Sequence, residues 1–150
     1  MTRVTGERMA ESLYQELLLK HHKMPVGYGL RDEFTHFEEG ENGVCGDEIR
    51  VSAKLNSEII ESVGFSGDSC AICRASASIM CGLVQGKSRN DVKQTISTAL
   101  KFLFPGNDDS PFLKGLDEEM LILSNVHQYP IRLQCARLPW STLNKLTEDW

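Results

Sequence analysis

The most informative stretch for the fold is residues 44–55, VCGDEIRVSAKL. From Asp47 onward, apolar and polar side chains alternate, so they point to opposite faces of an extended chain. One face carries the polar side chains, and the other carries Ile49, Val51, Ala53 and Leu55. This alternation predicts a half-buried strand over Asp47–Leu55, entered through a turn at Cys45-Gly46-Asp47.

Two more strands are expected around this one. Asn56-Ser57 is a turn signal, and Ile59–Ser66 behind it predicts a partner strand. Phe34–Glu38 is the candidate for a third. Because the connections are short, we expect a small three-stranded antiparallel sheet.

Helical spacing of apolar residues predicts one helix before the strands in the sequence and several after them. The predicted helical segments are Glu7–His22, Cys70–Val84, one from Ser88 to just before Pro105-Gly106, short pieces within Phe112–Val126, and Pro130–Trp150. Pro139 predicts a break, kink or restart of the last helix near Leu138. Strands followed by helices predict an α+β fold, and the length of 150 residues predicts one domain, 1–150.

Charge and composition disfavour several classes of function. The chain has 16 Lys plus Arg against 21 Asp plus Glu, a net charge of −5, and no basic stretch, which disfavours nucleic acid as a partner. No secretory signal and no apolar run of about 20 residues is visible, so we expect a cytoplasmic protein without membrane contact. The five cysteines of such a chain are expected to stay mostly reduced, which favours metal binding or thiol chemistry.

Three cysteines and one aspartate form a candidate four-ligand metal site. Cys45 and Asp47 flank Gly46, whose freedom at positive φ lets both side chains aim at one point, although a purely structural turn is the alternative. Cys70 follows Asp68-Ser69, which we expect to cap the buried helix, so its sulfur lies near the positive helix end or is simply buried.

The third sulfur is Cys135, in the first turns of the last predicted helix. It lies between Arg132 and Arg137, whose charges favour a thiolate. Thiolates together with a carboxylate suit zinc, or iron and sulfide.

The remaining cysteines and the histidines are interpreted differently. Cys70 and Cys73 form a Cys-x-x-Cys element, yet Cys73 shares a helical face with apolar residues, so core packing competes with an auxiliary ligand, a sulfur relay or a dithiol. Cys81 is expected in the core. We leave all four histidines out of the metal site.

Several motifs in order resemble the NifU/IscU/SufU family of iron–sulfur cluster assembly proteins. They cover nearly the whole chain: Leu13-Tyr14 with His21 to Pro25, Val44-Cys45-Gly46-Asp47, Gly67-Asp68-Ser69-Cys70-Ala71-Ile72 followed by Ala75-Ser76-Ala77-Ser78, then Pro130 and Arg132 to Trp140. The resemblance implies a SufE/IscU-like α+β fold and a shared site of Cys45, Asp47, Cys70 and Cys135.

Two features resemble the SufU branch of this family more than the IscU branch. Gln134 stands where the IscU branch has histidine, and Cys70 and Cys135 lie 65 positions apart, as in the branch with a central insertion. The resemblance then implies a zinc-dependent, sulfurtransferase-like carrier. Its Cys45 would accept persulfide sulfur from a cysteine desulfurase for a downstream assembly scaffold, with Arg132 orienting the incoming group.

Two alternatives stay open beside the carrier. The same ligands would suit a scaffold that assembles and transfers a [2Fe-2S] cluster, and Cys70 with Cys73 would suit a dithiol oxidoreductase. The chain also departs from the family pattern at Cys73, where serine is usual, at Lys20, where an acidic residue is usual, and at Val26-Gly27, where Arg-Asn is usual. Cys73 bears on which thiols hold the metal.

Overall fold

Three strands form one antiparallel sheet in the order β1-β2-β3 in the computed structural model, which describes residues 13, 15–30, 32–106 and 115–150. The strands are β1 His36–Asn42, β2 Asp47–Leu55 and β3 Ile60–Ser66. The β2 strand has the predicted bounds. Its apolar residues Ile49, Val51, Ala53 and Leu55 are all buried, as the alternation predicts.

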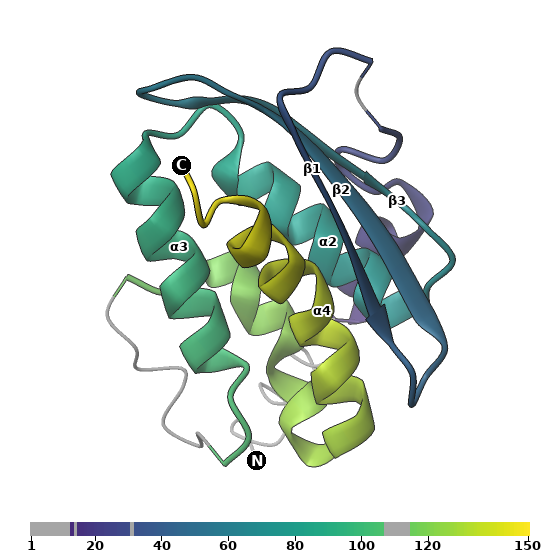
Figure 1. Cartoon of the computed structure of the whole chain (residues 1–150). Helices are drawn as coiled ribbons and strands as arrows, with labels where there is room; N and C mark the ends of the chain where they lie inside the picture. Colours follow the sequence, from purple (N-terminus) through teal and green to yellow (C-terminus); the bar gives the residue numbers. More distant parts are fainter. Residues whose placement is uncertain (1–12, 14, 31, 107–114) are drawn as a thin grey trace.

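Helices follow the sheet, which confirms the α+β prediction. They are α2 Ala71–Val84, α3 Arg89–Phe102, the 3₁₀ segment η2 Glu118–Gln128 and α4 Pro130–Leu146. Residues 15–23 are also helical, in agreement with the first predicted helix, of which 7–12 and 14 lie outside the described residues. Figure 1 shows α4 crossing in front of α2, with the sheet packed beside both helices and α3 at the far edge.

The core lies where α2 and α4 meet the sheet. One connected apolar cluster joins the inner face of the sheet to these helices and to α3 and η2. Its largest fully buried side chains include Trp140, Phe65 and Phe102. A buried hydrogen bond from the Ser76 hydroxyl to the Ala136 carbonyl, 2.6 Å long, joins α2 to α4 within this core.

Besides shifts of one or two residues at other ends, three features differ from the prediction. The β1 strand begins at His36 and extends to Asn42, because backbone pairing with β2 continues past the apolar residues to the Asn42–Asp47 pair. The α2 helix is capped by Cys70 itself and not by Asp68 or Ser69. The α4 helix runs through Pro139 without a break or restart and ends at Leu146, short of Trp150.

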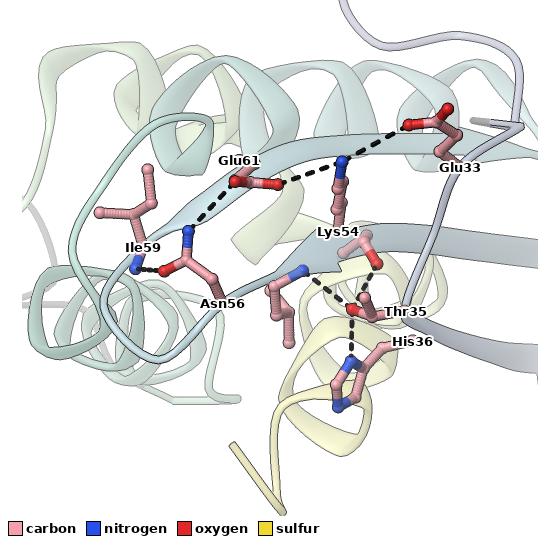
Figure 2. Close-up of polar contacts among 9 residues, drawn as sticks. Glu33, Thr35, His36, Lys54, Asn56, Ile59 and Glu61 are labelled. Atoms are coloured by element: carbon pink, nitrogen blue, oxygen red, sulfur yellow. Dashed lines mark hydrogen bonds and ion pairs between the residues drawn. The ribbon is translucent and has the colours of Figure 1, made fainter.

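Polar contacts secure the end of the sheet away from the β1–β2 turn, as Figure 2 shows. The Lys54 ammonium lies 3.4 Å from a Glu33 carboxylate oxygen and 3.5 Å from one of Glu61. The Thr35 hydroxyl accepts the Leu55 backbone N–H at 2.9 Å. These contacts link the β2–β3 hairpin to the segment before β1, at the end of the sheet opposite the turn that carries Cys45.

No helix within the described ranges is both long enough and apolar enough to span a membrane.

Candidate metal centre

Three separate parts of the chain bring sulfur and carboxylate atoms to one end of the sheet. The β1–β2 turn supplies Cys45 and Asp47, the start of α2 supplies Cys70, and the second turn of α4 supplies Cys135. The Cys45 and Cys135 sulfurs lie 3.0 Å apart, and both cysteines are free thiols. Ligand atoms of Cys45, Asp47 and Cys135 all lie within 4.8 Å of one another.

Asp47 lies in this group because of its position in β2. It is the first residue of the strand and has the same parity as the apolar set, so its side chain points to the core side and is only 2% exposed. Gly46 before it has φ +70°, a conformation that favours glycine. The predicted turn therefore places Cys45 and Asp47 on the same side, as expected.

Cys70 contacts the centre through Asp47. Its backbone N–H donates to Asp47 Oδ1 at 2.8 Å, and its sulfur lies 3.8 Å from Asp47 Oδ2. As the N-cap residue of α2, Cys70 also accepts the Cys73 N–H with its sulfur at 3.5 Å. A sulfur in this position takes the role that a serine oxygen usually has at a helix N-terminus.

Cys135 is the buried ligand candidate, at 1% exposure. Burial, followed by hydrogen bonds with Cys45, Asp47 and Cys70, raises the pKa of its thiol. Acidic groups packed this closely resist ionisation together, and a divalent cation among them reverses that effect.

The donor set fits zinc. Two thiolates on one tetrahedral zinc ion are about 3.8 Å apart, given zinc–sulfur bonds of about 2.3 Å. The Cys45 and Cys135 sulfurs, 3.0 Å apart, are closer together than this value, and the Cys70 sulfur lies 3.8 Å from an Asp47 oxygen. Cys70 lies outside the group of ligand atoms within 4.8 Å of one another and reaches it through Asp47.

The two arginines near Cys135 lie in different surroundings. The Arg132 guanidinium is 6.0 Å from the centre of the Tyr129 ring and lines a cavity of about 440 Å³ together with Ile72 and residues of η2. Arg137 Nη1 instead donates to the Leu100 and Leu103 carbonyls at the end of α3. Arg137 is thus engaged at the end of α3, and the effects of both arginines at Cys135 stay predictions.

Cys73 and Cys81 are core residues, each fully buried. Burial, then the nearby Asp47 charge, raises the pKa of Cys73 to about 12, so its thiol stays protonated at neutral pH. This disfavours a reactive Cys70–Cys73 dithiol. His21 bonds to the Ser78 hydroxyl of α2 at 2.7 Å and lies 3.5 Å from Glu119.

One residue of the centre escaped the sequence analysis. Asn42, the last residue of β1, accepts the Val44 N–H with its side-chain oxygen at 3.3 Å. Its side-chain nitrogen lies 3.8 Å from the Cys135 sulfur. An asparagine just before a turn is a local signal for its bond to the Val44 N–H. Its contact with Cys135 spans 93 residues and has no local signal in the sequence.

Comparison with known proteins agrees with this architecture. Residues 13–135 match the NifU-like N terminal domain. The chain belongs to the NifU-like N-terminal domain family. Among curated members, it is 32% identical over 139 residues to the zinc-dependent sulfurtransferase SufU of Bacillus subtilis (strain 168), covering 90% of this chain and 89% of that protein.

A second relative is equally similar. The iron–sulfur cluster assembly scaffold protein IscU of Thermotoga maritima is 32% identical over 133 residues, covering 89% of this chain and 91% of that protein. Both branches of the NifU-like family thus lie at the same identity from this chain, so overall similarity does not separate them.

Solved structures of NifU-like proteins share the fold. A SUF-system cluster assembly scaffold candidate from Fervidobacterium islandicum AW-1 superimposes with a TM-score of 0.74 at 28% identity, covering 89% of this chain and 95% of that one. The N-terminal part of a NifU-like protein from Brucella abortus gives 0.77 at 18% identity, covering 92% and 94%, which shows the fold alone. The predicted small antiparallel sheet packed by helices is therefore confirmed.

Proposed function

We propose that this chain is a zinc-dependent sulfur carrier in iron–sulfur cluster assembly, accepting persulfide sulfur from a cysteine desulfurase at Cys45. The observation that carries the proposal is the approach of Cys45, Asp47 and Cys135 to within 4.8 Å, with Cys70 on Asp47. The relative named as a zinc-dependent sulfurtransferase supports zinc. Gln134 and the spacing of Cys70 and Cys135 support the SufU-like assignment.

In this proposal Cys45, Asp47, Cys70 and Cys135 hold the metal. Zinc, when bound, keeps the thiols deprotonated and supplies no redox chemistry of its own. Asp47 is held in place by the Cys70 N–H, and Cys135 by the packing of α4 on α2. The buried ligands are therefore the fixed part of the centre.

Among the four proposed ligands, Cys45 is the one suited to leave the metal centre. It is half-buried on a turn beside Val44, which is 69% exposed, whereas Asp47 and Cys135 are buried. Its thiolate attacks the outer sulfur of the desulfurase's cysteine persulfide. The donor's sulfur–sulfur bond breaks, the donor cysteine leaves as a thiolate, and Cys45 carries the persulfide, with no net oxidation. A downstream cytoplasmic assembly scaffold would then receive this sulfur.

The test is a desulfurase assay with single-cysteine variants. Cys45→Ser should abolish both the stimulation of cysteine turnover and the persulfide found on this chain by mass spectrometry. Cys73→Ser is the matched control, because Cys73 is a buried protonated thiol in the same region. Full activity of Cys73→Ser also argues against the dithiol oxidoreductase, and unchanged stimulation by Cys45→Ser would overturn the assignment of the acceptor.

The scaffold alternative is favoured by the equally similar IscU relative. It uses the same four residues as ligands of a [2Fe-2S] cluster. Elemental analysis of the purified protein separates the two: a colourless protein with about one zinc per chain supports the carrier. A brown protein with iron and sulfide after anaerobic reconstitution supports the scaffold.

A further inference from the structure

Asn42 connects the turn that carries Cys45 to the helix that carries Cys135. Its side-chain oxygen accepts the backbone N–H of Val44, the residue before Cys45. A backbone N–H can only donate, so this contact fixes which amide atom is oxygen. The amide nitrogen must then face the other way, where the Cys135 sulfur lies at 3.8 Å.

The place of Asn42 in the sheet gives this bridge a rigid base. Asn42 pairs with Asp47 across the β1–β2 hairpin, so its backbone belongs to the sheet and not to the turn. The four turn residues 43–46 lie between the two members of this pair. If the turn opens to release Cys45, Asn42 is the last residue that stays in place, still in contact with Cys135.

Cys45 packs against the apolar cluster, and the polar contacts of its sulfur are with α4. Its sulfur contacts Cys135 at 3.0 Å and the Ile131 carbonyl at 3.9 Å, both on α4. Residues 43, 44 and 46 are exposed. A side chain that links the turn backbone to Cys135 therefore has a large share in keeping the turn closed over the centre.

We propose that Asn42 is a positioning residue that holds the Cys45 turn closed against Cys135 and so sets how readily Cys45 leaves the centre. This inference rests on the proposed function, in which Cys45 must leave to accept sulfur. The bridge works only if both halves are present: the oxygen on Val44 and the nitrogen on Cys135. Losing either half removes this link between the turn and α4, while the contacts of the Cys45 sulfur remain.

Substitutions separate this role from a simple turn-forming role. Asn42→Ser keeps an oxygen that can accept the Val44 N–H but lacks the donor to Cys135. Asn42→Asp likewise keeps the acceptor and loses the donor, and serves if the serine variant folds poorly. Asn90→Ser, at an exposed site on α3, is the matched control.

The experiment measures how fast iodoacetamide modifies Cys45 in the zinc-loaded chain, with the site assigned by peptide mass spectrometry. Asn42→Ser and Asn42→Asp should each raise this rate about fivefold over wild type, as expected for the loss of one hydrogen bond. Asn90→Ser should match wild type. The fully buried Cys81 reports general loosening, and its slow modification should not change.

Equal Cys45 rates in wild type and both Asn42 variants would overturn the inference, and so would a parallel rise at Cys81. A failure of this inference can be told apart from a failure of the proposed function. If the chain holds no zinc or accepts no sulfur, the same comparison on the reduced, metal-free chain still tests Asn42, because the bridge consists only of the chain's own atoms.

Discussion

Asp47 shows at the scale of one residue how a charged side chain becomes part of a core. It is 2% exposed, and a buried carboxylate requires compensation. The Cys70 N–H provides one hydrogen bond at 2.8 Å, and in the proposed function a cation held among Asp47 and the thiols would provide the rest. The residue thus belongs to the structure and to the metal centre together.

The short gap between Cys45 and Cys135 predicts how the metal-free chain oxidises. After zinc is removed, hydrogen peroxide should oxidise the half-exposed Cys45 to a sulfenic acid. The Cys135 sulfur then attacks the Cys45 sulfur, water leaves, and a disulfide forms. Non-reducing peptide mapping should find Cys45 joined to Cys135, and Cys73 and Cys81 unmodified. The zinc-loaded chain should resist the same treatment. A Cys70–Cys73 disulfide as the main product would contradict this expectation.

At the scale of elements, the link between β3 and α2 sets the place of Cys70. The Glu48 N–H of β2 donates to the Asp68 carbonyl at 2.9 Å, which holds the link against β2. Gly67 has φ +141°, and a Cβ added there would overlap the Glu48 carbonyl oxygen. Cys70 can reach Asp47 only because Gly67 lets the two backbones approach.

Gly67→Ala should therefore weaken the metal centre. Moving the link away from β2 draws Cys70 from Asp47, so we expect weaker zinc binding and a loss of about 1–3 kcal/mol in the free energy of unfolding. Gly106→Ala is the control, because Gly106 has φ +83° with nothing within 4 Å of an added Cβ. Competition with a chromophoric chelator measures zinc affinity, and denaturant unfolding measures stability. Equal zinc affinity in the Gly67→Ala and Gly106→Ala variants would contradict this prediction.

At the scale of the whole molecule, a metal at this centre joins the sheet, α2 and α4. Zinc at 100 times its dissociation constant should stabilise the fold by about 2.7 kcal/mol. For a chain of this size that corresponds to a rise in melting temperature of about 5–11 °C. Calorimetry with and without a chelator measures the shift. Cys135→Ser should respond weakly to zinc, and an undiminished shift in that variant would show that the stabilising zinc binds elsewhere.

The sequence alone determined the elements whose buried face repeats regularly. The alternation of β2 predicted its bounds, and the apolar stripe of α2 predicted Cys81 in the core but left the role of Cys73 open. The motifs also named the four candidate ligands, of which Cys45, Asp47 and Cys135 lie together and Cys70 contacts Asp47. The single domain, the acceptor role of Cys45 and the role of Arg132 stay predictions.

Only the tertiary structure decided the contacts between distant segments. The half-exposed β1 strand extends to Asn42 because β2 pairs with it, not because of its own pattern. Arg137 donates to carbonyls at the end of α3, and Asn42 reaches Cys135 across 93 residues. Local periodicity shows which side of an element is buried, but the partner of each buried or bridging atom depends on how whole elements pack.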